Sequence, residues 1–187
     1  MKWASFLLAG VLSNTLICQA QAAGVELFGA KLANADRPQL RAVLKQNNLG
    51  INREDNRYWY DIYDPSAQLQ GASELQVGYV QQSGRFAVAR YRFESFMDTE
   101  QVKQIISMVS QKYGKPARLR GNWQLGEVVA TWNMVDNMEI EVSRGWPETT
   151  TYLQYRHRPS HAAMMAEIKA NDAAEERSKA NRQGNAF

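Results

Sequence analysis

Apolar residues recur at helical spacing in two segments of the chain that lie 62 residues apart. Each segment starts with an aspartate, Asp36 or Asp98, and carries a glutamine three positions later, as at the start of a capped helix. We therefore predict two amphipathic helices that end at Gly50 and Gly114, because glycine readily adopts the left-handed conformation that ends many helices. The apolar positions that define them are Leu40, Val43 and Leu44 in the first helix and Val102, Ile105 and Ile106 in the second.

Segments with strand character follow each predicted helix. They cover residues 57–64, 74–80 and 85–93 after the first helix, and residues 127–134, 138–144 and 149–157 after the second. The order helix, strand, strand, strand thus occurs twice and predicts a tandem duplication. We expect an α+β fold: one antiparallel sheet, or two abutting sheets, with the two helices packed on one face and a further helix at the C-terminus. Residues 25–32 are expected to form one more strand.

Alternation in the second set of strands separates an apolar face from a polar face, because successive side chains of a strand point to opposite sides. The polar face carries both signs of charge, as expected for an antiparallel sheet that is open to water on one side. The apolar positions are Val128, Ala130, Trp132, Met134, Met138, Ile140, Val142, Thr151, Leu153 and Tyr155, and the polar ones include Thr131, Asn133, Glu139, Glu141, Ser143, Tyr152, Gln154 and Arg156.

The strand at 57–64 departs from this rule, because Tyr58, Trp59, Tyr60 and Tyr63 place aromatic rings on both of its faces. Two interpretations are open. The strand is buried on both faces, or Tyr58, Trp59 and Tyr60 form a platform for a small apolar or glycan ligand between the two repeats.

Residues 1–22 have the pattern of a secretory signal peptide, with Lys2, an apolar stretch and the small-residue sequence Ala20-Gln21-Ala22. The stretch is too short to span a bilayer, so we expect cleavage after Ala22, no transmembrane segment thereafter, and a periplasmic or secreted bacterial protein. Ile17 precedes Cys18, which argues against a lipid anchor. The boundaries that follow are 23–95 for the first repeat, 96–158 for the second, and 159–187 for a C-terminal helix with a frayed tail.

Composition narrows the classes of function. The 187 residues are 44% hydrophobic and 22% charged, which is typical of a soluble globular chain rather than a disordered one. The net charge of +3 is spread along the chain and does not indicate nucleic-acid binding. The one cysteine, Cys18, lies in the predicted signal peptide, so we expect a mature chain without disulfides, thiolate metal sites or a cysteine nucleophile.

Residues suited to catalysis are sparse. His157 and His161 are separated by Pro159 and are expected on different elements, which argues against a shared metal ion. The densest carboxylate cluster is Glu54, Asp55, Asp61 and Asp64, and we interpret it as a solvated cluster that Arg53 and Arg57 neutralise. We therefore predict no enzymatic activity, no catalytic residues, no metal and no cofactor.

Two predicted loops of the second repeat carry residues suited to binding a partner. Residues 112–125 contain four cations and no acid, followed by Trp123, and residues 144–148 form a hairpin tip with Trp146. Rigid aromatic side chains on loops are typical anchors of protein interfaces. We predict a protein partner, as for an inhibitor, an immunity factor or an envelope-assembly accessory; the architecture resembles that of secreted inhibitor and envelope-assembly modules. An anionic envelope component is a second candidate. The predicted binding residues are Trp123, Trp146, Arg118, Arg120, Tyr152 and Arg156.

Overall fold

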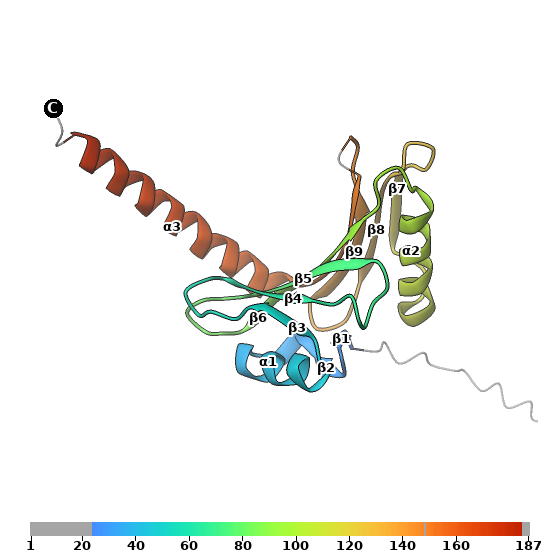
Figure 1. Cartoon of the computed structure of the whole chain (residues 1–187), viewed down its shortest axis with the longest axis horizontal. Helices are drawn as coiled ribbons and strands as arrows, with labels where there is room; N and C mark the ends of the chain where they lie inside the picture. Colours follow the sequence, from blue (N-terminus) through green and yellow to red (C-terminus); the bar gives the residue numbers. More distant parts are fainter. Residues whose placement is uncertain (1–23, 148, 185–187) are drawn as a thin grey trace, which may run out of the picture.

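The structure is a computed structural model that describes residues 24–147 and 149–184 (Figure 1). It is a mixed α+β fold with a large antiparallel sheet and a long C-terminal helix. The predicted signal peptide, residues 1–22, lies outside the described residues. The helices are α1 (Arg37–Gln46), α2 (Glu100–Tyr113) and α3 (Arg158–Gly184). The strands of the sheet are β3 (Gly50–Arg53), β4 (Tyr60–Asp64), β5 (Ala72–Tyr79), β6 (Phe86–Glu94), β7 (Arg118–Asn122), β8 (Glu127–Asn133), β9 (Met138–Arg144) and β10 (Thr150–His157).

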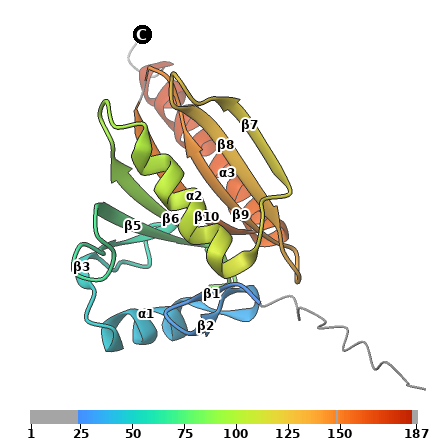
Figure 2. The ribbon, with the colours of Figure 1, turned by 90° about the vertical axis from the view of Figure 1, so that its right-hand side faces the viewer.

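The order of strands across the sheet is β3-β4-β5-β6-β10-β9-β8-β7. Strands β6 and β10 therefore lie in the centre, while β3 and β7 form the two edges. Helix α1 precedes the first four strands and α2 precedes the other four. The sheet bends, so that β4 and β5 run across the view of Figure 1 while β8 and β9 stand upright. Helix α2 lies against β8, β9 and β10 (Figure 2).

A single apolar core joins α1, α2 and one face of the sheet. Helix α1 buries Leu40 and Leu44 there, and α2 buries Val102, Ile105, Ile106 and Val109. The apolar face predicted from alternation in β8, β9 and β10 is confirmed, since its side chains lie in or against this core. Trp132 is buried and its indole N–H donates to the carbonyl oxygen of Gly114, 2.8 Å away. This bond fixes the end of α2 to the sheet.

The predicted cap of α1 is confirmed; at α2 the residue that precedes the helix is Thr99, and the predicted Asp98 lies one position earlier. Asp36 Oδ1 accepts a hydrogen bond from the amide of Gln39 (2.9 Å), and Asp98 Oδ1 accepts from the amides of Glu100 and Gln101 (2.8 and 3.3 Å). Gly114 ends α2 with a φ of +82°. The prediction that Gly50 ends α1 is wrong, because α1 ends at Gln46 and the left-handed residue is Asn48. Asparagine tolerates that conformation better than most residues.

The predicted count of strands is also wrong. Four strands follow each helix, because β3 and β7 were missed; both are short, polar and almost wholly exposed, so they show no alternation. Residues 25–32 do not form one strand. They form a hairpin of β1 (Glu26–Leu27) and β2 (Ala30–Lys31), followed by a 3-10 helix at Leu32–Asn34. Phe28 and Gly29 both have positive φ values there, which turns the chain back on itself.

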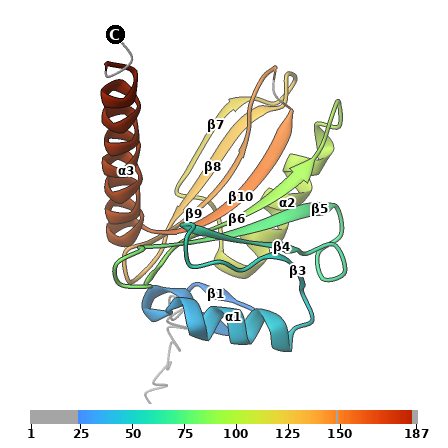
Figure 3. The same cartoon turned by 60° about the vertical axis from the view of Figure 1, so that its left-hand side comes forward.

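The outer face of the sheet, opposite α1 and α2, is open only in part. Met164 of α3 packs with Val80, Ala87 and Val88 in a second apolar cluster, against which Trp59, Tyr60 and Ile168 also pack. The carboxylate of Glu167 accepts from the indole N–H of Trp59 and from the amides of Gln81 and Gln82. The start of α3 thus covers the β5–β6 region, and its remainder projects away from the sheet as an exposed helix (Figure 3).

Candidate partner-binding surface

Three connections meet at one end of the sheet, and we call them the loop end. They join β6 to α2 (residues 95–99), β7 to β8 (residues 123–126) and β9 to β10 (residues 145–149, of which 148 is not described). Figure 1 shows them together at the upper end of the upright part of the sheet. Met97, Leu125 and Trp146, one from each connection, line a shared hollow of about 300 Å³.

Large apolar side chains are exposed at the loop end. Phe96 is 73% exposed, Met97 79%, Trp146 51% and Leu125 43%. Trp123 is 36% exposed, and the ammonium group of Lys103 lies 5.9 Å from its ring centroid. Neither predicted tryptophan is therefore buried against the strands. An apolar cluster that faces water is the kind of surface that marks an interaction site.

The buried side chain of Arg144 holds the three connections together. It is only 2% exposed, and its guanidinium donates to the carbonyl oxygens of Phe96 (2.9 Å) and Leu125 (3.1 Å) and to the hydroxyl oxygen of Ser95 (3.3 Å). A Cβ atom on Gly126 would come within 2.1 Å of this guanidinium, so the β7–β8 turn needs a glycine there. The loop end is thus fixed from inside by a cation rather than left as independent flexible loops.

The backbone at Phe96 is strained. Its φ is +40°, which costs energy for a residue with a side chain. The hydrogen bond from Arg144 to its carbonyl oxygen helps to hold this conformation. The result is that Phe96 and Met97 point into water instead of folding onto the core. Arg144 was not among the predicted site residues, although it occupies the apolar register of β9 after Met138, Ile140 and Val142, where an arginine signals a buried cation.

The other four predicted binding residues lie on the outer face of the sheet. Arg118 and Arg120 are on the edge strand β7, not in a loop as predicted, and Tyr152 and Arg156 are on β10. The guanidinium of Arg90 lies 5.3 Å from the ring centroid of Tyr152. The predicted residues therefore fall into two groups, with the tryptophans at the loop end and the rest across the outer face.

A polar groove of about 400 Å³ crosses the outer face beside β7, lined by Arg118, Arg120, Glu139 and Glu141 among others. Arg156 donates to both glutamates, at 2.6 and 2.8 Å, and so neutralises part of their charge. Within residues 24–147 and 149–184, Arg118 and Arg120 have no carboxylate within ion-pair distance. These two cations are the groups that this groove offers to a ligand.

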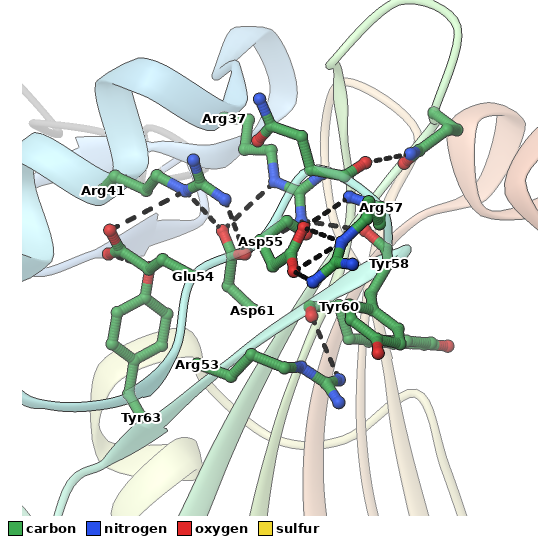
Figure 4. A network of polar contacts seen from close by, with 12 residues as sticks. Arg37, Arg41, Arg53, Glu54, Asp55, Arg57, Tyr58, Tyr60, Asp61 and Tyr63 are labelled. Atoms are coloured by element: carbon green, nitrogen blue, oxygen red, sulfur yellow. Dashed lines mark hydrogen bonds and ion pairs between the residues drawn. The ribbon is translucent and has the colours of Figure 1, made fainter.

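The predicted aromatic platform has partners within the chain. Tyr58 stacks with Arg53, whose guanidinium carbon lies 4.3 Å from the ring centroid. Trp59 donates to Glu167 of α3, and Tyr60 packs against the cluster around Met164. Figure 4 shows Tyr58 and Tyr60 near Arg53 and Arg57. Helix α3, rather than a second repeat, is what meets Trp59 and Tyr60 at the start of β4.

Beneath α1 lies a buried ionic network, which corrects the prediction of a solvated carboxylate cluster (Figure 4). Asp61 has no exposed surface, and both of its oxygens accept hydrogen bonds from Arg37 (2.8 and 3.2 Å) and Arg41 (2.8 Å each). Burial alone would raise the pKa of Asp61, but the hydrogen bonds from Arg41 and Arg37 outweigh it and lower the pKa. The network ties α1 to β4 and leaves no free acid and base pair.

Asp55 and Glu54 of the cluster are also paired, whereas Asp64 is exposed, as predicted, and its carboxylate accepts from the amide of Ser66. Arg57 binds the carboxylate of Asp55 at 2.6 Å, and these hydrogen bonds lower the pKa of Asp55 to about 2. Tyr63 donates to Glu54 at 2.8 Å. In the described ranges no three His, Cys, Asp or Glu side chains are grouped so that they could hold a metal ion. Nor is any helix among these residues both long and apolar enough to cross a membrane.

Comparison with known proteins gives little more. No protein-family model and no curated protein sequence matches the chain. Among solved structures, the chain is similar to the crystal structure of a DUF4309 family protein (YjgB) from Bacillus subtilis. The identity is 14% and the TM-score 0.38, and the similarity covers 65% of this chain and 78% of that chain. A similarity of this extent supports no statement about function.

Proposed function

We propose that the mature chain is a secreted or periplasmic, non-catalytic binding protein that holds another protein through its loop end and the adjoining outer face of the sheet. The observation that carries the proposal is the exposed apolar cluster of Phe96, Met97, Leu125 and Trp146. We also propose that the two halves, each a helix followed by four strands, arose by duplication, since Asp36 and Asp98 accept backbone amides at the starts of α1 and α2 and the first strand of each half is an edge.

Preorganisation of the loop end supports binding of a protein. Aromatic and methionine side chains in the centre of an interface contribute most of the binding free energy when a partner removes them from water. Because Arg144 already fixes the three connections, little conformational entropy is lost when the partner binds. An extended surface of this kind suits a protein better than a small molecule.

The small-ligand alternative has less support. Tyr58, Trp59 and Tyr60 would have to leave Arg53, Glu167 and the Met164 cluster before they could bind a glycan between the halves. The loop end needs no such rearrangement, because its apolar side chains are already exposed.

The proposal is tested by recovering the partner from the cell envelope with a tagged mature chain after chemical cross-linking. Trp146→Ala and Phe96→Ser variants should lose the stoichiometric partner that the unchanged protein recovers. Their melting temperatures should stay the same, because both side chains are exposed. Ile51→Ala is the matched control, since Ile51 is 50% exposed at the far edge strand. Equal recovery by all four proteins would exclude the loop end as the binding surface.

A further inference from the structure

Strand β7 is an open edge of the sheet, in which Gly121 alone has a positive φ, +119°. Among the described residues it pairs with β8 alone, from Arg118 opposite Thr131 to Asn122 opposite Glu127, with no shift of register. All five of its residues are exposed. An edge strand leaves a row of backbone N–H and C=O groups without partners, and these groups can pair with a strand from another chain.

The opposite edge strand, β3, is poorly suited to pairing with a further strand. Its register with β4 shifts between Ile51 and Arg53, as at a β-bulge. Arg53 donates to the carbonyl oxygen of Tyr60 and stacks on Tyr58, so its side chain is held within the chain. Bulges of this kind are a usual protection of edge strands. The two edges therefore differ, and β7 is the one that a further strand can extend.

The side chains of β7 define what such a strand must carry. Arg118 and Arg120 lie on the outer face, because their register partners Thr131 and Val129 do. Leu119 lies between them on the inner face and is 48% exposed. Lys112 and Lys115 add positive charge nearby, and residues 112–125 contain no Asp or Glu. The complementary strand has acidic side chains opposite the arginines and an apolar side chain opposite Leu119.

A second copy of the chain does not meet this requirement. Antiparallel pairing of two β7 strands about their middle places Arg120 opposite Arg120, and a parallel pair in register places both arginines opposite themselves. Like charges directly opposite each other destabilise a pair of strands. The charges of β7 thus disfavour self-association and favour an acidic partner.

We propose that β7 binds an extended segment of the protein partner in which Asp or Glu alternates with apolar residues, adding it as a ninth strand of the sheet. This inference rests on the proposed function and specifies the chemistry of the partner. The added strand lies along the free side of β7, across from β8 and the polar groove; Arg118 and Arg120 bind its carboxylates on the outer face, and Leu119 packs against its apolar side chain.

The test is selection of random short peptides displayed on phage against the mature chain. Selected sequences should alternate acidic and apolar residues. Arg118→Glu with Arg120→Glu should weaken the selected peptides by about tenfold or more. Arg177→Glu with Arg182→Glu is the matched control, because it makes the same change of charge on the exposed part of α3 and should leave binding unchanged.

Strand pairing has a signature that charge attraction lacks. Methylation of one alternating set of peptide amides should abolish binding and methylation of the other set should not, and hydrogen exchange should slow at residues 118–122. The inference would be overturned if the selected peptides lack alternation, if no peptide is enriched, or if both methylations are tolerated equally. Arg118 and Arg120 would then serve only to prevent unwanted pairing at this edge. A double variant that still recovers the cellular partner, while Trp146→Ala loses it, would overturn the β7 inference and retain the proposed function.

Discussion

Replacement of Arg144 by methionine should loosen the loop end and destabilise the protein. The substitution removes hydrogen bonds to Ser95, Leu125 and Phe96 while keeping most of the apolar volume of the side chain. Each such bond contributes about 1 kcal/mol, and more where one group is charged. Phe96 is exposed, so water can replace part of what its carbonyl loses. We therefore expect a loss of about 2 to 3 kcal/mol in the free energy of unfolding.

A loss of this size should lower the melting temperature by roughly 4 to 12 °C in a chain of this length. Urea unfolding gives the free energy directly, and hydrogen exchange should accelerate at residues 95–99 and 123–126. Arg120→Met is the control, because Arg120 is exposed on β7 and should change stability by no more than about 0.5 kcal/mol. The structural role of Arg144 would be refuted if hydrogen exchange at residues 95–99 and 123–126 were no faster than in Arg120→Met. It would also be refuted if removal of the buried charge increased the free energy of unfolding.

Further substitutions test the rest of the fold. Asp61→Asn should cost about 3 to 5 kcal/mol at neutral pH, because it leaves two arginines without their buried partner. Since the folded pKa of Asp61 is lowered, the difference from the unchanged protein should be constant above about pH 5 and shrink as pH falls through about 4 and below, as urea unfolding across pH would show. Gly78→Ala places a Cβ atom 3.0 Å from Met164 Sδ and 2.8 Å from Tyr60, so hydrogen exchange at the start of α3 should accelerate. Asp36→Ala and Asp98→Ala should each lower stability by about 1 kcal/mol in thermal melts, and losses several times larger would contradict their assignment as caps.

The sequence predicted the elements whose side chains alternate or recur between core and water. Six of the eight strands of the sheet lie within three residues of their predicted bounds, because apolar side chains mark their inner face. Strands β3 and β7 were not predicted, because their residues are exposed and show no alternation between core and water. Only backbone pairing defines these two strands. That pairing depends on neighbours distant in sequence, which local pattern does not reveal.

The residues of the candidate site also divide into those that the local sequence predicts and those that depend on partners distant in the sequence. The position of Trp146 in the connection between two strands was predicted correctly, because it is a local property of the sequence. The burial of Asp61 was not predicted, because its partners Arg37 and Arg41 are 24 and 20 residues away and meet it only when α1 packs on β4. Arg144 could have been identified from the alternation of β9, where it takes an apolar position.

The junction of β10 and α3 has a mechanical consequence. His157 ends the strand and Arg158 begins the helix, so no connecting residue separates them. Force applied to the C-terminal end of α3 first meets the contacts of Glu167 and Met164, and then passes directly into β10. Because β10 is hydrogen-bonded to β6 on one side and β9 on the other, it cannot be peeled away like an edge strand. The projecting helix α3 is therefore attached to a central strand, and a pulling force on it is resisted by hydrogen bonds on both sides of that strand.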